Sequence, residues 1–136
     1  DQLEAHNNKL QAKYRDIEKN HTRVETYNCD DADVIVTAYG TVSRIVKNVI
    51  KEAAKEGIKV GLIRPITLWP FPSKAIAERA KQVKGILTVE LNAGQMVEDV
   101  RLAVECKVPV EHFGRLGGIV PDPDEVVNAL KTKLIK

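Results

Sequence analysis

The chain of 136 residues has the size of one folded domain with an appendage, long enough to bury a sizeable core. Hydrophobic residues make up 43% of it and charged residues 29%, as is ordinary for globular proteins. The formal net charge is +2, and no basic run is interleaved with aromatic side chains. We therefore expect no nucleic-acid partner.

No apolar run approaches the roughly 20 residues that a membrane-spanning helix needs, and no secretory leader is recognisable. We therefore expect no membrane partner and a cytoplasmic location. The only methionine is Met96, which indicates a chain that is processed or cut from a longer polypeptide.

The first 22 residues are polar and charged, with a narrow apolar stripe at helical spacing. The stripe consists of Leu3, Leu10, Tyr14 and Ile17. Such a stripe is too thin for a core but can lie along another surface. We predict that residues 1–22 form a helical arm or linker and that residues 23–136 form the folded domain, beginning with a possible edge strand at residues 23–28.

From Asp33 onward, short apolar strands alternate with amphipathic helices. The predicted strands cover residues 34–36, 59–63, 86–91 and 108–113. The first predicted helix covers residues 42–54, and the second starts at Pro72 or Ser73 with Ile76, Ala80 and Val83 inward. The third follows the turn at residues 92–94 and carries Val97, Val100 and Val104 on one face. The last begins after Asp122. This alternation predicts a three-layer α/β/α fold with a mostly parallel sheet covered on both faces.

Helix starts are also readable. Asp122 is predicted as the N-cap of the last helix, with Pro123 at its first position and Glu125 completing a capping box. Asn92 is predicted as the N-cap of the helix after the third parallel strand.

A proline-rich segment follows the strand at residues 59–63. The strand is expected to break at the step from Arg64 to Pro65, because the residue before proline is pushed out of the helical region. The loop then carries the only tryptophan, Trp69, and Phe71 between prolines. Two interpretations stay open: a docking element, or a braced loop whose two aromatic side chains cap the sheet.

Chemical signatures are sparse. Cys29 and Cys106 are far apart and indicate reduced cysteines of an intracellular protein, and the three histidines lack zinc-ligand spacing. We predict no metal site. An acid–base pair of Glu90 and His112 is conceivable at the carboxyl ends of the strands, but strand-end polar residues are common and we predict no catalytic residue.

The glycine-rich segment Gly114–Gly118 also allows two interpretations. It could present backbone N–H groups and Arg115 to an anion, or it could simply let the chain turn. No dinucleotide-binding or phosphate-loop fingerprint accompanies it.

Three segments together resemble one family. Arg64–Pro72, Val89–Met96 with Asp99-Val100-Arg101, and Gly114–Gly118 come in the order found in 2-oxoacid:ferredoxin oxidoreductases. They are most similar to the transketolase-C-like, carboxy-terminal domain of the alpha subunit, as in 2-oxoisovalerate and 2-oxoglutarate enzymes. The leading segment His6–Arg15 is also similar, so the resemblance covers essentially the whole chain.

The resemblance implies a five-stranded sheet of order 1-3-2-4-5 whose first strand is antiparallel. It also implies an enzyme that decarboxylates a 2-oxoacid such as 2-oxoisovalerate on thiamine diphosphate and Mg²⁺. The acyl group passes to coenzyme A, and electrons pass through iron–sulfur clusters to ferredoxin. In such enzymes the cofactors lie on other domains and subunits, so we expect none to be bound by this domain.

On this basis the domain is expected to organise contacts with the other domains and subunits. The candidate interface residues are Arg64, Trp69, Phe71, Asn92, Gly94, Gln95, Met96, Arg101 and Arg115. An alternative function is a stand-alone module that binds a small ligand, nucleotide or anion at Arg64, Arg115, Gly117 and Gly118. Contact of the arginines with an acyl–coenzyme A is a third possibility.

Overall fold

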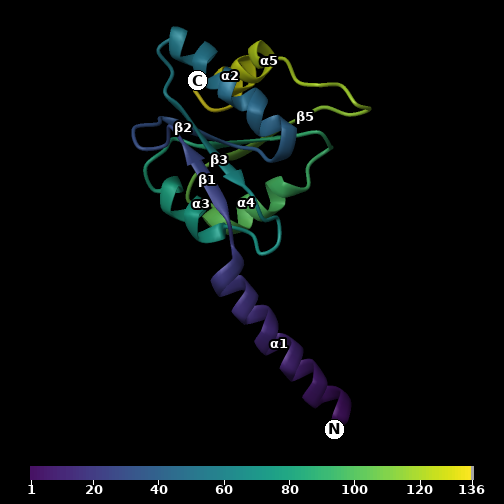
Figure 1. Ribbon diagram of the computed structural model, residues 1–136. Coiled ribbons are helices and arrows are strands. Elements are labelled where there is room, and N and C mark those ends of the chain that lie inside the picture. Colours follow the sequence, from purple (N-terminus) through teal and green to yellow (C-terminus); the bar gives the residue numbers. More distant parts are fainter. Residues whose placement is uncertain (136) are drawn as a thin grey trace.

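The computed structural model describes residues 1–135 (Figure 1). The helices are α1 (Gln2–His21), α2 (Gly40–Lys55), α3 (Ser73–Ala80), α4 (Met96–Val104) and α5 (Pro123–Lys133). The strands are β1 (Val24–Tyr27), β2 (Val34–Thr37), β3 (Val60–Pro65), β4 (Ile86–Glu90) and β5 (Val110–Gly114). After β1, strands and helices alternate as the sequence predicts.

The strands form one sheet in the order β1-β3-β2-β4-β5. β1 pairs with β3 in antiparallel orientation, and every other pair is parallel. Helices α2 and α5 cover one face of the sheet, and α3 and α4 cover the other (Figure 1). The α/β class, the mostly parallel five-stranded sheet and the strand order implied by the family resemblance are confirmed.

The two hydrophobic cores follow from the alternation of side chains along the central strands. In β2, Val34 and Val36 face α2 and α5, whereas Ile35 lies in the core formed with α3 and α4. All three side chains are fully buried. A strand that is apolar on both faces is typical of a parallel sheet with two helical layers.

One predicted strand boundary is wrong. β3 does not break at the Arg64–Pro65 step but continues through it, because β1 pairs antiparallel with this end of the strand. Val24 lies opposite Pro65, and Glu25 lies opposite Arg64. The extended backbone that proline imposes on Arg64 is compatible with a strand as well as with a loop.

Helix α1 stands apart from the two cores. None of the 20 residues from Gln2 to His21 is buried, and the helix projects away from the sheet in Figure 1. Its contact with the rest of the chain includes an edge-on packing of Tyr14 against Trp69, with ring centroids 5.8 Å apart. Within residues 1–135, no helix is long and apolar enough to cross a membrane. The division of the chain after residue 22 remains a prediction.

The capping box at the last helix is confirmed. The Asp122 side chain accepts from the Asp124 backbone N–H at 2.9 Å, and the Glu125 carboxylate accepts from the Asp122 N–H at 3.2 Å. Pro123 occupies the first turn, where its missing N–H costs no helical hydrogen bond. At α3, in contrast, the helix ends at Ala80, so Val83 lies beyond it, although it still packs against the core.

Candidate functional site

The carboxyl ends of the four parallel strands lie at one edge of the sheet, and the three segments singled out in the sequence follow β3, β4 and β5 there. The chain leaves β2 toward β3 but leaves β4 toward β5. At the carboxyl ends of the adjacent strands β2 and β4, the two connections therefore leave in opposite directions along the sheet. Open α/β sheets place their ligand sites at such a point.

The two aromatic side chains of the proline loop lie in different environments, one exposed and one packed against the core. Trp69 is 56% exposed, and Phe71 is half-buried and packs against the core that α3 and α4 cover. Thr67 braces the loop: its hydroxyl accepts from the Arg23 N–H at 2.9 Å and donates to the Pro70 carbonyl at 2.8 Å. The loop is therefore held in shape, with Trp69 exposed and packed edge-on against Tyr14 and with Phe71 anchored against the core.

Two hollows adjoin this loop. A groove of about 820 Å³ lies between the end of α1 and the loop, and its lining includes Glu18, Val24, Trp69 and Phe71. A smaller pocket of about 180 Å³ is lined by residues from the β2–α2 connection, the proline loop and the start of α4. These residues are Tyr39, Leu68, Phe71, Gln95, Met96 and Asp99. The smaller pocket brings together two of the three predicted segments at the point where the strand connections diverge.

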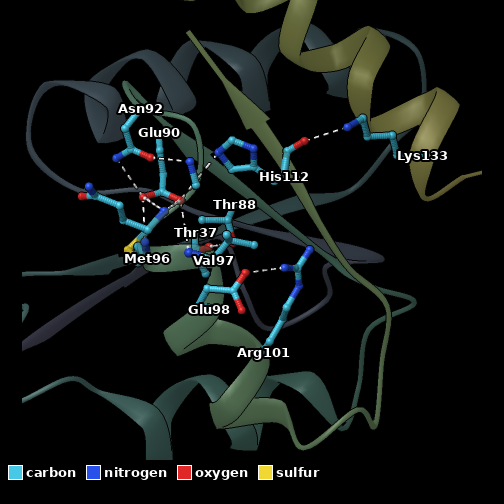
Figure 2. Close-up of polar contacts among 12 residues, drawn as sticks. Thr37, Thr88, Glu90, Asn92, Met96, Val97, Glu98, Arg101, His112 and Lys133 are labelled. Carbon is cyan, nitrogen blue, oxygen red and sulfur yellow. Dashed lines mark hydrogen bonds and ion pairs between the residues drawn. The ribbon is translucent and has the colours of Figure 1, made fainter. Parts of the chain in front are cut away.

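The turn between β4 and α4 is organised by a buried carboxylate. The Glu90 side chain is completely inaccessible to solvent. Its carboxylate accepts hydrogen bonds from four donors, all of which belong to this turn or to the start of α4 (Figure 2). Its oxygens accept from the backbone N–H groups of Gln95 at 3.2 Å, Met96 at 2.8 Å and Val97 at 3.1 Å. The Asn92 side-chain amide donates to it at 3.1 Å. The charge is thus stabilised by the first N–H groups of a helix, where the helix dipole favours an anion.

The prediction that Asn92 caps α4 is wrong. The helix begins at Met96 with Gln95 as its N-cap residue, and the Gln95 side chain makes no capping hydrogen bond because Glu90 takes the free N–H groups. The Asn92 side chain closes the turn instead, accepting from the Gly94 N–H at 2.7 Å. Gly94 has a φ of 112°, a backbone region that favours glycine.

His112 of β5 lies beside this turn. Its Nε2 atom is 3.7 Å from Glu90 Oε2, is buried, and has no hydrogen-bond partner among residues 1–135. The two side chains are therefore neighbours, as an acid–base pair would require. The oxygens of Glu90 are already engaged by four donors, which suits a structural anion better than a base that must reach a substrate.

Arg64 is held by another carboxylate. Its guanidinium donates to Glu25 of β1 at 2.9 Å, and Lys47 of α2 donates to the same carboxylate at 2.9 Å. The hydrogen bond from Lys47, followed by that from Arg64, holds the pKa of the Glu25 carboxyl below its ordinary value of 4.5. Arg64 therefore ties the edge strand β1 to β3.

Arg115 has a carboxylate partner as well. It forms an ion pair with Glu125 in the first turn of α5, and its guanidinium lies 5.9 Å from the centre of the Phe113 ring. Arg64 lies near the end of β3 and Arg115 directly follows β5, and these two strands are three steps apart in the sheet, roughly 14 Å at about 4.8 Å per step. The two arginines proposed for an anion site are therefore separated, and each faces an internal carboxylate.

The remaining predicted residues fall into two groups. Gln95 is exposed at the carboxyl edge, whereas Met96 next to it is buried. Arg101 lies more than one turn into α4, away from this edge, and pairs with Glu98 at 2.6 Å on the helix surface (Figure 2). Gly117 and Gly118 have φ values of 65° and 80° in an exposed loop. Within residues 1–135, no group of three His, Cys, Asp or Glu side chains is placed to hold a metal ion.

The sequence reasoning missed two features of this edge. The loop after β5 exposes three large apolar side chains, more than half of each accessible; they are Leu116, Ile119 and Val120. It also missed the internal role of Glu90. The signal was present, because a glutamate inside the apolar run from Ile86 to Leu91 has to be paired when the strand is buried.

Comparison with known proteins adds to this geometry. The family model "Pyruvate:ferredoxin oxidoreductase core domain II" matches residues 32–126. Ketoisovalerate oxidoreductase subunit VorB of Methanothermobacter thermautotrophicus is 44% identical over 131 residues, which are 96% of this chain and 37% of that protein. The 2-oxoglutarate synthase subunit KorA of Methanothermobacter marburgensis is 40% identical over 101 residues, 74% of this chain and 27% of that protein. The chain thus spans little more than a third of the length of the VorB relative.

Two solved structures share the fold. The 2-oxoglutarate:ferredoxin oxidoreductase from Magnetococcus marinus superposes with a TM-score of 0.74 over 87% of this chain and 21% of that chain, at 23% identity. A split-gene transketolase superposes with a TM-score of 0.71 over 83% of this chain and 41% of that chain, at 20% identity. The resemblance to 2-oxoacid:ferredoxin oxidoreductases is confirmed. Because the family model covers most of its length, the chain belongs to the pyruvate:ferredoxin oxidoreductase core domain II family.

Proposed function

We propose that the chain is part of a 2-oxoacid:ferredoxin oxidoreductase of the cytoplasm. The complete enzyme decarboxylates a 2-oxoacid with thiamine diphosphate and Mg²⁺, transfers the acyl group to coenzyme A and delivers electrons through iron–sulfur clusters to ferredoxin. Similarity to ketoisovalerate and 2-oxoglutarate oxidoreductase subunits supports this proposal. The identity to VorB over nearly the whole chain favours 2-oxoisovalerate as the substrate.

The cofactors are assigned to other domains and subunits, and the chemistry of this chain agrees with that division. A cluster normally needs four thiolates, and the chain has two cysteines, Cys29 in the core and Cys106 exposed. The free N–H groups at the start of α4, which could otherwise hold a diphosphate, are engaged by Glu90.

The proposed role of this domain is to organise contacts with the other domains and subunits through the carboxyl edge. The observation that carries the proposal is that three positive features of this end of the sheet each face an internal carboxylate. Arg64 faces Glu25, the α4 N-terminus faces Glu90, and Arg115 faces Glu125. Each of these three places is a poor anion site, because its positive group is already neutralised.

The same edge also exposes large apolar side chains. Leu68 and Trp69 of the proline loop and the three apolar side chains of the loop after β5 are each more than half exposed. Exposed apolar groups of this kind are typical of protein–protein interfaces, in which aromatic side chains carry much of the binding energy. Residues 1–22 are proposed to act as a helical arm that leads into the domain.

The test introduces the variants into the full oxidoreductase subunit that contains residues 1–136 and reconstitutes it with the other subunits from its source cells. Assembly is measured by size-exclusion chromatography, and activity by coenzyme A-dependent reduction of a viologen dye with 2-oxoisovalerate. We expect Trp69→Ala, Gln95→Ala and Arg115→Ala together to weaken assembly. Leu102→Ala serves as the control, because Leu102 is 76% exposed but lies in the second half of α4. Normal assembly and turnover of the triple variant would contradict the proposal.

A second candidate is a small-ligand module, favoured by the pocket of about 180 Å³ at the diverging strand connections. A stand-alone binding module should be stabilised in a saturable way by a nucleotide or anion, whereas an assembly domain should not. A thermal-shift series with ATP, coenzyme A and phosphate on the 136-residue chain separates the two. Saturable stabilisation by ATP or phosphate would favour the binding module. Stabilisation by coenzyme A and by neither of the other two would favour contact with an acyl–coenzyme A.

A further inference from the structure

The start of α4 is unusual in having its free N–H groups satisfied from inside the protein by a residue of another element. A helix leaves its first N–H groups without intrahelical partners, and water or a nearby capping side chain normally satisfies them. Here Gln95, Met96 and Val97 all donate to Glu90, which lies at the end of β4 five to seven positions earlier in the chain. The next N–H, that of Glu98, bonds to the Gln95 carbonyl at 3.1 Å.

We propose that Glu90 is a positioning residue: a built-in anion that fixes the Asn92–Met96 turn in the shape in which it docks. This inference rests on the proposed assembly role of the carboxyl edge. The Glu90 carboxylate occupies the place that an external phosphate takes at other helix N-termini. The N–H groups that could bind a ligand are therefore bonded to Glu90, and the surface turn that contains them stays ordered without a ligand.

The turn is held from two sides, which explains how one carboxylate can set its shape. On the side of β4, Asn92 donates to Glu90 and accepts from the Gly94 N–H. On the side of β5, a Cβ atom on Gly114 would lie 2.2 Å from the Asn92 carbonyl oxygen and 2.6 Å from His112 Cε1. The turn is therefore packed closely against β5 and anchored by Glu90.

A fixed turn presents its exposed residues without an ordering cost at the moment of binding. Gln95 is the exposed N-cap residue of α4, and its backbone N–H is one of those that Glu90 accepts. Loss of the carboxylate would leave Gln95 on a mobile turn, and the partner would then have to order it. Pre-organisation of this kind raises affinity without adding a contact.

The first test needs no partner and no variant. In amide hydrogen exchange followed by NMR on the 136-residue chain, the N–H groups of Gln95, Met96 and Val97 should exchange about a hundredfold or more slowly than solvent-exposed amides. Amides at the start of a helix are otherwise among the fast ones, because they have no helical partner. Fast exchange of all three amides would overturn the inference, whatever the variants do.

The second test removes the carboxylate and returns it as a solute. Glu90→Ala should lose the protection of the three amides and bind the remaining oxidoreductase subunits about tenfold more weakly. Acetate should restore both properties in a saturable way, and acetamide, which has the same shape but no charge, should not. Glu98→Ala is the matched control, because Glu98 is an acidic residue of the first turn of α4 that lies on the exposed surface.

The outcomes separate this inference from the proposed function. Failure of the unmodified chain to bind the subunits contradicts the assembly role, while amide exchange still tests Glu90. If the unmodified chain binds and a folded Glu90→Ala chain binds equally well, the positioning role is wrong. If Glu90→Ala folds only in acetate, the carboxylate requirement is supported directly.

Discussion

Replacement of Glu90 by glutamine tests the physical core of this account, because it keeps the shape of the side chain and removes its charge. Glutamine has one acceptor oxygen instead of two, and its amide group would point at backbone N–H groups that are themselves donors. In the structure Oε1 accepts from Asn92 and Met96, and Oε2 accepts from Val97 and, at the shorter distance, from Gln95. One of these two sets is lost in any rotamer.

The magnitude follows from the number of bonds lost. Hydrogen bonds to charged groups contribute about 1.5 to 3 kcal/mol each, and part of the loss is offset because a buried charge no longer has to be desolvated. The loss of two such bonds less this offset predicts that Glu90→Gln lowers the free energy of unfolding by about 3 kcal/mol. For a domain of this size such a loss lowers the melting temperature by roughly 10 °C.

The assay is urea denaturation at neutral pH followed by circular dichroism, with Glu98→Gln as the control. Glu98 carries the same charge and lies in the first turn of α4, the helix start that Glu90 is proposed to hold, but its side chain is 67% exposed and pairs with Arg101 at the surface. Exposed pairs of this kind contribute less than about 1 kcal/mol. Surface substitutions usually change the free energy of unfolding by no more than about 0.5 kcal/mol. If Glu90→Gln changes it by no more than that, the carboxylate does not hold the helix start and the reasoning is refuted.

Three further predictions concern other parts of the chain. Gly114→Ala should cost about 1 to 3 kcal/mol in the same urea assay, since its Cβ would overlap the Asn92 carbonyl; an unchanged midpoint contradicts this packing. The pKa of Glu25 is depressed, so the unfolded chain takes up its proton first as the pH falls, and the stabilisation is complete above pH 4.5 and lost below it. Glu25→Gln should therefore flatten the fall in stability as the pH drops below 4.5, and an equally steep fall would argue against the ion pair. In a thiol assay with Ellman's reagent, exposed Cys106 should react at once, whereas Cys29, whose pKa is raised by burial, should react only on unfolding.

The fold was largely predictable because its determinants are local. Apolar runs such as Val34–Val36 fit strands buried on both faces, and the capping box of Asp122 and Glu125 marks a helix start without tertiary information. The order of the strands and the direction of β1 came from the family resemblance, because the four residues of β1 carry too little pattern to show which strand they pair with.

The site was predicted less completely because its chemistry depends on contacts between distant residues. Asn92 fits the composition rule for an N-cap, but Glu90 reaches the same N–H groups from the end of β4 and displaces it. Likewise, Arg64 and Arg115 resemble anion ligands until their partners Glu25 and Glu125 are known. A sequence shows which side chains can neutralise one another, but their pairing is decided by the packed sheet.

The most direct test of the assembly role uses the single tryptophan as a reporter. Trp69 is replaced biosynthetically by 5-fluorotryptophan, and the ¹⁹F spectrum of the 136-residue chain is recorded before and after addition of the unlabelled remaining subunits of the oxidoreductase. The account predicts that the one resonance shifts and loses its sensitivity to replacement of H₂O by D₂O, because the exposed indole becomes covered. A complex that forms while this resonance keeps its position and its solvent sensitivity would contradict docking through the carboxyl edge.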